Sequence, residues 1–487
     1  MGEAARVCLV SAEVTPFAKT GGLGDAVAGL TRYLARAGHD ARLIAPLYSS
    51  IDTSGRGFEV VEFARDVPVD CGAERLTFSL VSAPLPDGGP RMYFIHCPPL
   101  YDRPSIYTGG EDDALRMAFL ARAAIEACQR MGWSPQVFHC NDWHAALLPL
   151  YLRTHYGWDN LFSATRTLLT IHNIGYQGVF DSGVLGQLDL AEHANLLPRE
   201  DVAAGRINFL RTGCVYATAL STVSPTHARE IQTAEYGSGL ESLLQRRSGD
   251  LVGILNGVDT DEWNPATDPL IPHHYDCEDL TGKIRNKEDL LHSIGLGYRP
   301  ETPLVGIVTR LTKQKGIDLL RQSLPWFLSN HDMQLVAVGS GDREYETMLG
   351  HIALSFPGRA YFYRGYNNQL AHWVEAGSDI FLMPSLYEPC GLNQMYSLRY
   401  GTVPVVRRTG GLADSVRDYD WLTGQGTGFV FDDYNHEGLG WALGSALETW
   451  RHPEAWTSLV RRGMAEDFSW DRQGLLYLDL YRRLAGA

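Results

Sequence analysis

The sequence has no uninterrupted run of apolar residues long enough to cross a membrane, which takes about 18 residues. Its first apolar stretch, residues 7–12, ends at Glu13 and is shorter than the apolar region of a secretory signal peptide. Both absences argue against a membrane-spanning or exported protein. We therefore expect a soluble protein of the cytoplasm.

The sequence also lacks any paired cysteine motif of the CxxC type. Its eight cysteines are scattered along the chain, at Cys8, Cys71, Cys97, Cys128, Cys140, Cys214, Cys277 and Cys390. This distribution is not that of a disulfide framework. We expect reduced thiols, most of them buried.

The sequence has fewer basic than acidic residues. Lys and Arg number 42 against 57 Asp and Glu, which gives a net charge of −15. This balance argues against partners that bind by phosphate attraction alone, such as nucleic acid or an anionic membrane. It leaves room for a neutral polymer as substrate and for one local basic pocket that binds a small phosphorylated ligand.

The sequence does contain two successive series of alternating strand and helix patterns. With 487 residues, 45% of them hydrophobic and 20% charged, it suits a globular protein of two or three domains. We expect strands at residues 7–11, 42–45, 92–96, 137–140, 168–172 and 220–223, and then at 304–309, 334–338, 361–364, 379–384 and 403–406. Helical patterns separate most of them, among others at residues 24–37, 114–131, 144–155, 316–328 and 391–400. Such alternation predicts two doubly wound α/β units, each with a parallel sheet covered by helices.

We expect an N-terminal domain of residues 1–255 and a C-terminal domain of residues 256–468. The polar, proline-containing residues 256–287 are the expected hinge. A last helix within residues 469–487 either caps the second domain or returns to the first. Ligands of open parallel sheets bind beyond the carboxyl ends of the strands, so we expect the active site where the two domains face each other across a cleft.

The first motif, KTGGLGD at residues 19–25, follows the first strand and opens the first helix. Glycines allow close approach to a ligand, and a helix N-terminus with a lysine beside it suits a diphosphate. The spacing is neither that of a P-loop nor that of the dinucleotide fingerprint. The alternative is a tight turn that binds nothing.

The second motif, RLTKQKG at residues 310–316, follows the first strand of the second unit. Three cations at the end of a strand, before a glycine and a helix, form a concentrated anion site. Arginine can bind phosphate with two hydrogen bonds, whereas lysine acts as a mobile charge. A solvated basic turn is the alternative.

The third motif, YEPCGLN at residues 387–393, lies between a strand and a helix and places Glu388 at the edge of the second sheet. A carboxylate that binds sugar hydroxyls beside backbone N–H groups that bind phosphate is what a nucleotide-sugar site needs. Glu388 could instead only stabilise the helix N-terminus. Downstream, Thr409 and Gly410 open a similar turn and are further candidate phosphate contacts.

The fourth group combines HCNDWH at residues 139–144 with IHNIGYQG at residues 171–178, each at the end of an apolar strand. Histidine and cysteine in one cluster raise the question of zinc, but the spacing matches no common ligand pattern, so we expect no metal. From spacing alone, His172 is either a functional group or a histidine that stabilises the turn.

These motifs, with ILNGVDTDEWNP at residues 254–265 and RRTGGLAD at residues 407–414, resemble those of bacterial glycogen synthases and plant starch synthases. They occur in the order of that family and cover nearly the whole chain. The resemblance implies two Rossmann-like domains in the GT-B arrangement and a retaining glucosyltransferase. It also implies ADP-glucose as donor, an α-1,4-glucan as acceptor, and neither a metal nor a cofactor.

The resemblance also implies roles for single residues. It places His172, Arg310, Lys315, Glu388 and Asp142 in the catalytic site, with His172 near the anomeric carbon and the two cations on the leaving diphosphate. The residues that it implies for binding ADP-glucose are Lys19, Gly21, Gly22, Asp25, Asn256, Tyr366, Gly391, Leu392, Thr409 and Gly410, and Tyr101 matches a further cleft residue.

Three alternative functions remain at this point. A retaining transferase of the same architecture could use UDP-glucose and a small sugar. An α-glucan phosphorylase would be expected to have a pyridoxal-phosphate lysine and a much longer chain. A non-catalytic binding protein would have no need for cations placed on a leaving group.

Overall fold

The computed structural model describes residues 4–55, 57–72, 74–86 and 89–486, which form two compact units. Unit 1 contains the chain up to Gly257 and again from Trp470 onward, and unit 2 is Val258–Ser469.

Unit 1 is built on a large sheet with the strand order β12-β11-β8-β7-β1-β2-β6-β5-β3. The strands are β1 (Arg6–Val10), β2 (Asp40–Pro46), β3 (Glu59–Val60), β4 (Val67–Cys71), β5 (Glu74–Pro84), β6 (Arg91–His96), β7 (Val137–Asn141), β8 (Arg166–Ile171), β11 (Ala219–Thr222) and β12 (Leu251–Gly253). From β12 to β6 all neighbours are parallel, whereas β5 runs antiparallel to β6, β3 and β4. The predicted parallel sheet is therefore confirmed for its main part, and an antiparallel edge that the sequence did not reveal extends it.

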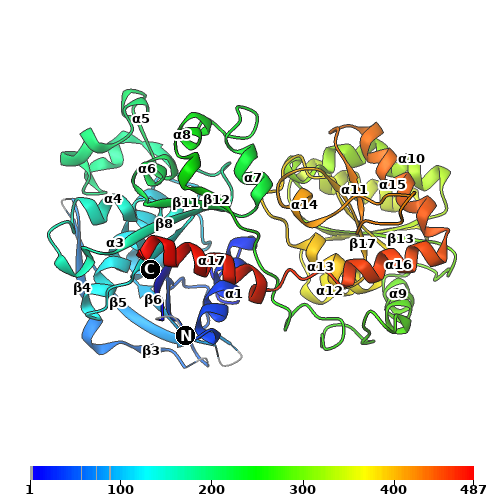
Figure 1. Cartoon of the computed structure of the whole chain (residues 1–487), viewed down its shortest axis with the longest axis horizontal. Helices are drawn as coiled ribbons and strands as arrows, with labels where there is room; N and C mark the ends of the chain where they lie inside the picture. Colours follow the sequence, from blue (N-terminus) through cyan, green and yellow to red (C-terminus); the bar gives the residue numbers. More distant parts are fainter. Residues whose placement is uncertain (1–3, 56, 73, 87–88, 487) are drawn as a thin grey trace. The chain divides into compact units, whose positions relative to one another are not determined.

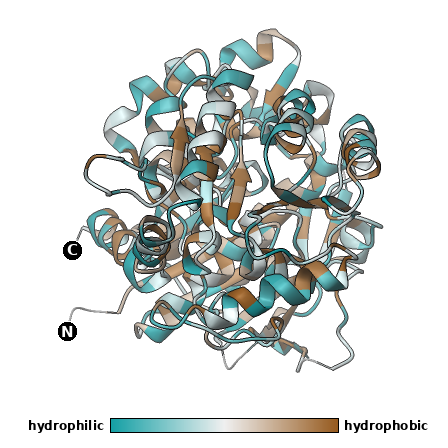
Figure 2. Ribbon diagram, turned by 90° about the vertical axis from the view of Figure 1, so that its right-hand side faces the viewer, coloured by the Kyte–Doolittle hydropathy of each residue, from teal (hydrophilic) through white to brown (hydrophobic). Residues whose placement is uncertain are grey.

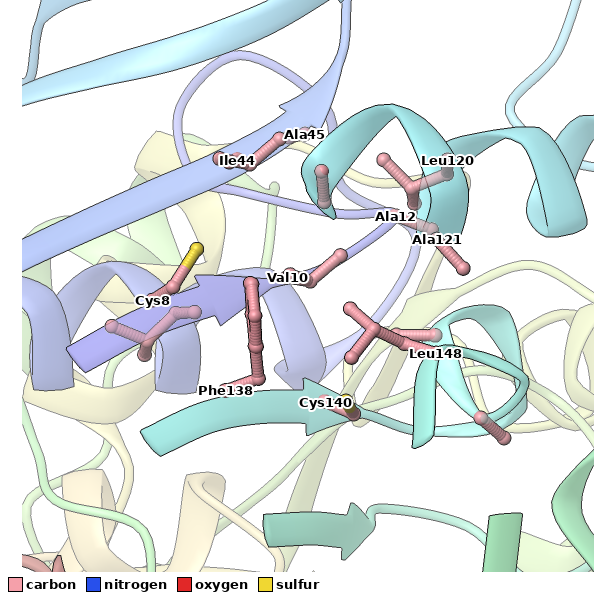
Figure 3. Close-up of a cluster of buried hydrophobic side chains, with 14 of the residues drawn as sticks. Cys8, Val10, Ala12, Ile44, Ala45, Leu120, Ala121, Phe138, Cys140 and Leu148 are labelled. Carbon is pink, nitrogen blue, oxygen red and sulfur yellow. The ribbon is translucent and has the colours of Figure 1, made fainter. Parts of the chain in front are cut away.

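The central strands of this sheet are buried on both faces. In β1 and β7 almost every side chain is inaccessible to solvent, as expected for apolar strands of a parallel sheet. Figure 3 shows Cys8 and Val10 of β1 and Phe138 of β7 beside Leu120 of α3 and Leu148 of α4. Figure 2 shows the same division over the molecule, with brown strands inside and teal outer faces on the helices.

The helices of unit 1 follow the predicted periodicity closely in long segments and less closely in short ones. The α-helices are α1 (Gly22–Arg36), α2 (Pro98–Tyr101), α3 (Asp112–Arg130), α4 (Leu148–Arg153), α5 (Arg199–Ala203), α6 (Phe209–Tyr216), α7 (Pro225–Glu230), α8 (Glu241–Arg246) and α17 (Trp470–Ala485). The helix expected at residues 144–155 is instead a 3₁₀ turn, η2 (Trp143–Ala145), followed by α4, which begins with Pro149 in its first turn. Proline suits the first turn of a helix but not its interior, so it divides the expected helix. A small hairpin of β9 (Val179–Asp181) and β10 (Arg206–Asn208) completes the unit.

Unit 2 contains a fully parallel sheet with the order β15-β14-β13-β16-β17-β18. Its strands are β13 (Leu304–Val308), β14 (Gln334–Gly339), β15 (Ala360–Arg364), β16 (Ile380–Met383), β17 (Val403–Arg407) and β18 (Phe429–Phe431). Its α-helices are α9 (Thr281–Ser293), α10 (Ile317–Asn330), α11 (Arg343–Ser355), α12 (Asn368–Gly377), α13 (Asn393–Arg399), α14 (Gly410–Ser415), α15 (His436–Trp450) and α16 (Pro453–Met464). The predicted doubly wound architecture of this half is confirmed.

The stretch expected to be a hinge packs within unit 2 for most of its length. The indole of Trp263 is stacked between His372 and Tyr396, with ring centroids 3.8 and 3.9 Å away. Farther along, Lys283 and Lys287 of α9 are buried, and the Lys287 ammonium pairs with Asp379 at 2.6 Å. These contacts fix residues 263–287 to the core of unit 2.

The C-terminal helix α17 belongs to unit 1 and packs on α1, where Figure 1 shows it in red beside the blue first helix. The indole of Trp470 fills a space that exists because Gly29 and Gly257 have no side chains: a Cβ on Gly29 would lie 2.0 Å from the indole nitrogen. Deeper in the sheet, the Tyr481 hydroxyl and His139 Nδ1 share a hydrogen bond of 2.7 Å. Of the two destinations expected for this helix, the structure shows the return to the first unit.

No disulfide joins any of the eight cysteines, all of which lie among the described residues; seven are buried and Cys277 is partly exposed. In the described part of the chain, no helix combines the length and apolar character that crossing a membrane requires.

Candidate functional site

Most of the predicted site residues follow the carboxyl ends of parallel strands in the two sheets. In unit 1 the strand order reverses at β1, which lies between β2 and β7, and in unit 2 it reverses at β13, which lies between β14 and β16. Such switch points create the crevice in which open α/β sheets bind ligands. The KTGGLGD turn follows β1, and the RLTKQKG turn follows β13.

In the turn after β1, an ion pair holds Lys19. Its ammonium lies 2.7 Å from Asp25 Oδ2, and Asp25 also accepts a hydrogen bond from the hydroxyl of Thr15. The Lys19 side chain remains 44% exposed. Asp25 thus orients a cation that is accessible to a ligand.

The two glycines of this turn differ in what they offer a ligand. The N–H of Gly21 donates to the carboxylate of Glu13, a buried residue that the sequence reasoning did not single out. The N–H of Gly22, the first residue of α1, has no hydrogen-bond partner within the described residues. The N–H of Gly22 is thus open to a ligand, whereas the N–H of Gly21 is bound to an internal carboxylate. The signal in the sequence was Glu13 itself, a charge that interrupts an apolar run.

Asp142, directly after β7, is buried and has an unusual backbone conformation. Its φ of +59° and ψ of −173° lie in a region that side chains other than glycine rarely adopt. Burial raises the pKa of its carboxyl well above the usual value, although backbone N–H groups of Trp143, His172 and Asn173 donate to it and act in the opposite direction. Asp142 joins the turn after β7 to the turn after β8.

His172, at the end of β8, is a neutral hydrogen-bonding group. Surrounding protein lowers its pKa to about 3. Its Nε2 lies 3.0 Å from the side-chain oxygen of Asn141, whose amide group donates to two backbone carbonyls. Because that oxygen can only accept, Nε2 carries the proton and Nδ1 is left as an acceptor. His172 can therefore accept a hydrogen bond from a hydroxyl group but supplies no positive charge.

Two predicted cleft residues of unit 1 are buried. Asn256 is 4% exposed, and its side-chain oxygen has no hydrogen-bond partner within the described ranges. Tyr101 is fully buried, its hydroxyl donates to the carbonyl of Arg116, and its ring packs edge-on against Tyr48. The expectation that Tyr101 lines a cleft is corrected: its aromatic ring is part of the core.

A cavity of about 440 Å³ lies beside the turn that carries His172. It is lined by Trp143, Gly175, Tyr176, Gln177, Gly178, Val179 and Ser238. The Tyr176 side chain is 55% exposed. Gly178 allows the Trp143 ring to pack closely against the backbone of this turn, since a Cβ on Gly178 would lie 2.3 Å from that ring. The cavity combines an aromatic wall with polar groups at its rim.

In unit 2 the switch point brings together two residues that are far apart in the sequence. The Lys315 ammonium lies 2.5 Å from Glu388 Oε2, and the Ser385 hydroxyl donates to the same oxygen. Glu388 is buried, and the Lys315 side chain is 17% exposed. A lysine follows β13 and a carboxylate follows β16, so the sheet order itself makes them neighbours.

The loop around Glu388 is compact and presents backbone donors. Gly391 has a φ of +71°, and a Cβ there would meet Gln394 and the Glu388 side chain. The N–H groups of Gly391 and Leu392, just before α13, have no hydrogen-bond partners among the described residues. Gly410 has a φ of +44°, and a Cβ on it would lie 1.9 Å from the carbonyl oxygen of Glu388. The structure thus shows Gly410 in contact with the backbone that carries Glu388.

The remaining predicted residues of unit 2 differ in exposure. Arg310 is exposed, and in the described part of the chain its guanidinium has no ion pair. Tyr366 is 65% exposed and follows β15, and its hydroxyl donates to Asn368. Thr409 is fully buried, which leaves its side chain no open face toward a ligand.

No cluster of three or more histidine, cysteine, aspartate or glutamate side chains able to hold a metal ion occurs in the described part of the chain.

Comparisons with known proteins assign both halves of the chain. Residues 6–246 match the family described as the starch synthase catalytic domain, and residues 295–462 match glycosyl transferases group 1. The chain is 44% identical over 485 residues to a glycogen synthase of Anaeromyxobacter dehalogenans, with 99% of each chain covered. It is 42% identical over 483 residues to a glycogen synthase of Koribacter versatilis, with 98% of each covered.

Solved structures give the same picture. The catalytic domain of starch synthase IV from Arabidopsis thaliana, solved with ADP and acarbose bound, superposes with a TM-score of 0.93 at 34% identity, covering all of both chains. A sucrose-phosphate synthase from Thermosynechococcus elongatus superposes with a TM-score of 0.62 at 17% identity and covers 99% of each chain, a similarity of fold alone.

Proposed function

The chain belongs to the glycogen synthase family of GT-B glycosyltransferases, and on this basis we propose that it transfers glucose from ADP-glucose to the non-reducing end of an α-1,4-glucan. The configuration at the anomeric carbon is retained. The described residues contain no disulfide, which supports a cytoplasmic location, where thiols stay reduced.

The observation that carries this proposal is the Lys315–Glu388 pair at the switch point of unit 2. Lys315 and the exposed Arg310 neutralise the diphosphate as it leaves, which stabilises the transition state more than the ground state. Glu388 binds glucose hydroxyls, and the N–H groups of Gly391 and Leu392 bind phosphate oxygens. Gly410 packs against the backbone of Glu388 and so helps to hold its loop in place.

The edge of unit 2 also offers a surface for the base of the nucleotide. The Tyr366 ring is exposed at the end of β15, and we assign it to stack on the adenine. In unit 1, Lys19 contacts the donor phosphates, Asp25 orients it, and Gly22 adds a backbone donor. Asn256 contributes its side-chain oxygen as an acceptor.

The acceptor glucan occupies the cavity beside His172. Glucose rings have apolar faces and hydroxyl edges, which suit the Tyr176 ring and the polar rim of this cavity. The Nδ1 atom of His172 accepts a hydrogen bond from a sugar hydroxyl.

Transfer with retention proceeds by attack on the front face of the sugar. The acceptor 4-hydroxyl oxygen bonds to the anomeric carbon as the bond to the diphosphate breaks, and a diphosphate oxygen takes the hydroxyl proton. A double displacement would need a carboxylate nucleophile. Asp142, the buried carboxylate near His172, already accepts hydrogen bonds from three backbone N–H groups, which supports the front-face route. A glucosyl adduct trapped on Asp142 would disprove it.

The test is nucleotide release by the purified protein with glycogen and either ADP-glucose or UDP-glucose. We expect release of ADP that depends on glycogen and lengthens its outer chains. Release with UDP-glucose alone would identify a different donor. Binding of glycogen without release from either donor would identify a binding protein.

The acceptor assignment has a separate test. Tyr176→Ala should raise the KM for glycogen and for maltoheptaose about tenfold, as expected for the loss of one stacking contact, and leave the KM for ADP-glucose unchanged. The matched control is Phe63→Ala, since Phe63 is also exposed in unit 1 but does not line the cavity. Equal effects of the two variants would contradict the assignment.

A further inference from the structure

The carboxylate of Glu13 is fully used by groups inside unit 1. Its Oε2 accepts from the backbone N–H groups of Thr20 at 2.8 Å and Gly21 at 3.2 Å. Its Oε1 accepts from the hydroxyls of Thr20 at 2.7 Å and Tyr107 at 2.6 Å. A carboxylate has about four acceptor positions, so these donors saturate it. Glu13 is only 4% exposed.

Three of these four hydrogen bonds come from the turn that carries Lys19. Thr20 and Gly21 lie between Lys19 and α1, and Gly21, at the start of the helix, has no side chain that could cap it. The Glu13 carboxylate therefore fixes the backbone on the C-terminal side of Lys19. Asp25 holds the Lys19 ammonium itself.

The fourth hydrogen bond, from Tyr107, connects this turn to the turn after β7. The Tyr107 ring stacks on His144, with centroids 4.9 Å apart and planes 18° from parallel. His144 lies in η2, immediately after Asp142 and Trp143. Glu13 thus joins the turn after β1 to the turn after β7, the two strand ends that border the switch point of unit 1.

We infer that Glu13, with Tyr107, is a positioning residue that sets the Lys19 turn for the diphosphate of the donor without touching the substrate. The inference rests on the proposed function insofar as Lys19 contacts that diphosphate. It predicts that the effect of losing Glu13 passes through Lys19.

The test compares Glu13→Ala with Glu13→Gln. Alanine leaves the N–H groups of Thr20 and Gly21 without their acceptor, and we expect kcat/KM for ADP-glucose to fall about 10- to 100-fold, since small misplacements of this kind carry that cost. Glutamine can keep its oxygen on the two N–H groups, and the two hydroxyls can turn to accept from its amide. Glu13→Gln should therefore stay within about threefold of the wild type. The KM for glycogen should not change in either variant.

A double variant separates positioning from general destabilisation. If Glu13 acts through Lys19, adding Glu13→Ala to Lys19→Ala should lower kcat/KM by less than about twofold beyond Lys19→Ala alone. Multiplication of the two effects would overturn the inference, and so would near-normal kinetics of Glu13→Ala.

The Tyr107→Phe variant and the binding of ADP test the inference further. If Glu13→Ala does not fold, Tyr107→Phe keeps the stack on His144 but removes the hydroxyl. It should raise the KM for ADP-glucose about two- to fivefold, and no change would overturn the inference.

Calorimetric titration with ADP measures binding without turnover. If the wild type binds ADP but transfers no glucose, the proposed function fails, whereas weaker ADP binding by Glu13→Ala than by Glu13→Gln still supports the role of Glu13. Equal binding by these two variants overturns it.

Discussion

At the scale of single residues, each switch point contains a lysine held by a carboxylate. Lys19 pairs with Asp25 in unit 1, and Lys315 pairs with Glu388 in unit 2. A lysine side chain is a flexible stem of four methylene groups. If an ion pair already holds it in place before the substrate arrives, less conformational entropy is lost on binding. Both pairs thus prepare a cation for an anionic ligand.

We expect Lys315→Ala to lower kcat by about 100- to 1,000-fold, as for loss of one group that stabilises developing negative charge. The measurement is steady-state release of ADP with glycogen as acceptor. The variant also leaves the buried Glu388 without its cationic partner, so thermal unfolding should be followed in parallel.

Lys313→Ala is the matched control. Lys313 lies in the same 3₁₀ turn, η7 (Lys313–Lys315), but is exposed. Its loss should change kcat by less than about threefold, as for a solvated surface charge. Similar losses in both variants would mean that the turn acts by its total charge and that the Lys315 ammonium has no special position.

Two buried histidines predict an acid-sensitive unit 1. Burial lowers the pKa of His139 and of His144 to about 3, from an ordinary value of 6.5. Below pH 6.5 the unfolded chain takes up protons that the folded chain does not, so stability is lost as the pH falls. Between pH 7.5 and 5.5 each histidine should lower the free energy of unfolding by about 1 kcal/mol.

His144→Phe isolates one of these contributions. Phenylalanine can keep the stack on Tyr107, and the Nδ1 atom of His144 has no hydrogen-bond partner in the described ranges. The raised pKa of Asp142 acts in the opposite direction in both proteins, so the informative quantity is the difference between their urea-unfolding curves. The variant should lose about 1 kcal/mol less than the wild type between pH 7.5 and 5.5. Parallel pH profiles would contradict the burial of a neutral His144.

At the scale of secondary-structure elements, the contact between α1 and α17 depends on glycines. Gly29 leaves room for the Trp470 indole, and Gly474 of α17 leaves room for the Tyr33 ring, to which a Cβ would come within 2.2 Å. The missing side chains let two helices from opposite ends of the chain pack closely.

Gly29→Ala should therefore destabilise unit 1 by about 1–3 kcal/mol, the usual cost of overpacking. The control is Gly444→Ala in α15, where nothing lies within 4 Å of the added methyl group. That variant should be up to about 1 kcal/mol more stable, since alanine favours helix more than glycine does. Urea unfolding measures both, and a stabilised Gly29→Ala would show that α17 does not pack on α1 as described.

At the scale of the whole molecule, unit 1 is discontinuous in sequence whereas unit 2 is continuous. Unit 2 is Val258–Ser469, and unit 1 needs the chain from Trp470 onward. In α17 the buried side chains include Trp470, Tyr477 and Tyr481, which would otherwise leave apolar surface open to water.

Expressed alone, residues 258–469 should fold and unfold cooperatively, because this segment contains its own sheet and core. Residues 1–257 alone should be aggregated or markedly less stable, and a separate peptide of residues 468–487 should restore stability in proportion to its concentration. Circular dichroism and thermal unfolding decide the matter. A stable fragment 1–257 that ignores the peptide would show that α17 contributes little to unit 1.

Much of the fold could be predicted from local patterns. The expected strand at residues 334–338 corresponds to β14, and the expected helix at residues 114–131 corresponds to α3. The antiparallel part of the sheet around β5 (Glu74–Pro84) was not predicted, because apolar and polar residues alternate along the first part of β5, which gives a weaker signal than a continuous apolar run. The helix boundary at Pro149 was predictable in principle from the proline.

The candidate site could be predicted less completely. Motifs identified Lys315 and Glu388 separately, since each follows a strand. The prediction for Tyr101 was wrong, because the local sequence does not show whether a tyrosine in a loop-like segment lines a cleft or, as here, is fully buried. Glu13 was missed because its partners Thr20 and Tyr107 are recognisable only once the chain is folded.

The alternation of strands and helices, the two-unit architecture and the order of the motifs follow from periodicity and turn chemistry within short segments, so they can be recognised without the fold. Which residues meet, such as Lys315 with Glu388 and α17 with α1, is settled when the chain folds. Strand order and burial decide these contacts. A parallel sheet brings the ends of β13 and β16 together whatever the distance along the chain, and the core removes from solvent whichever side chains that order encloses.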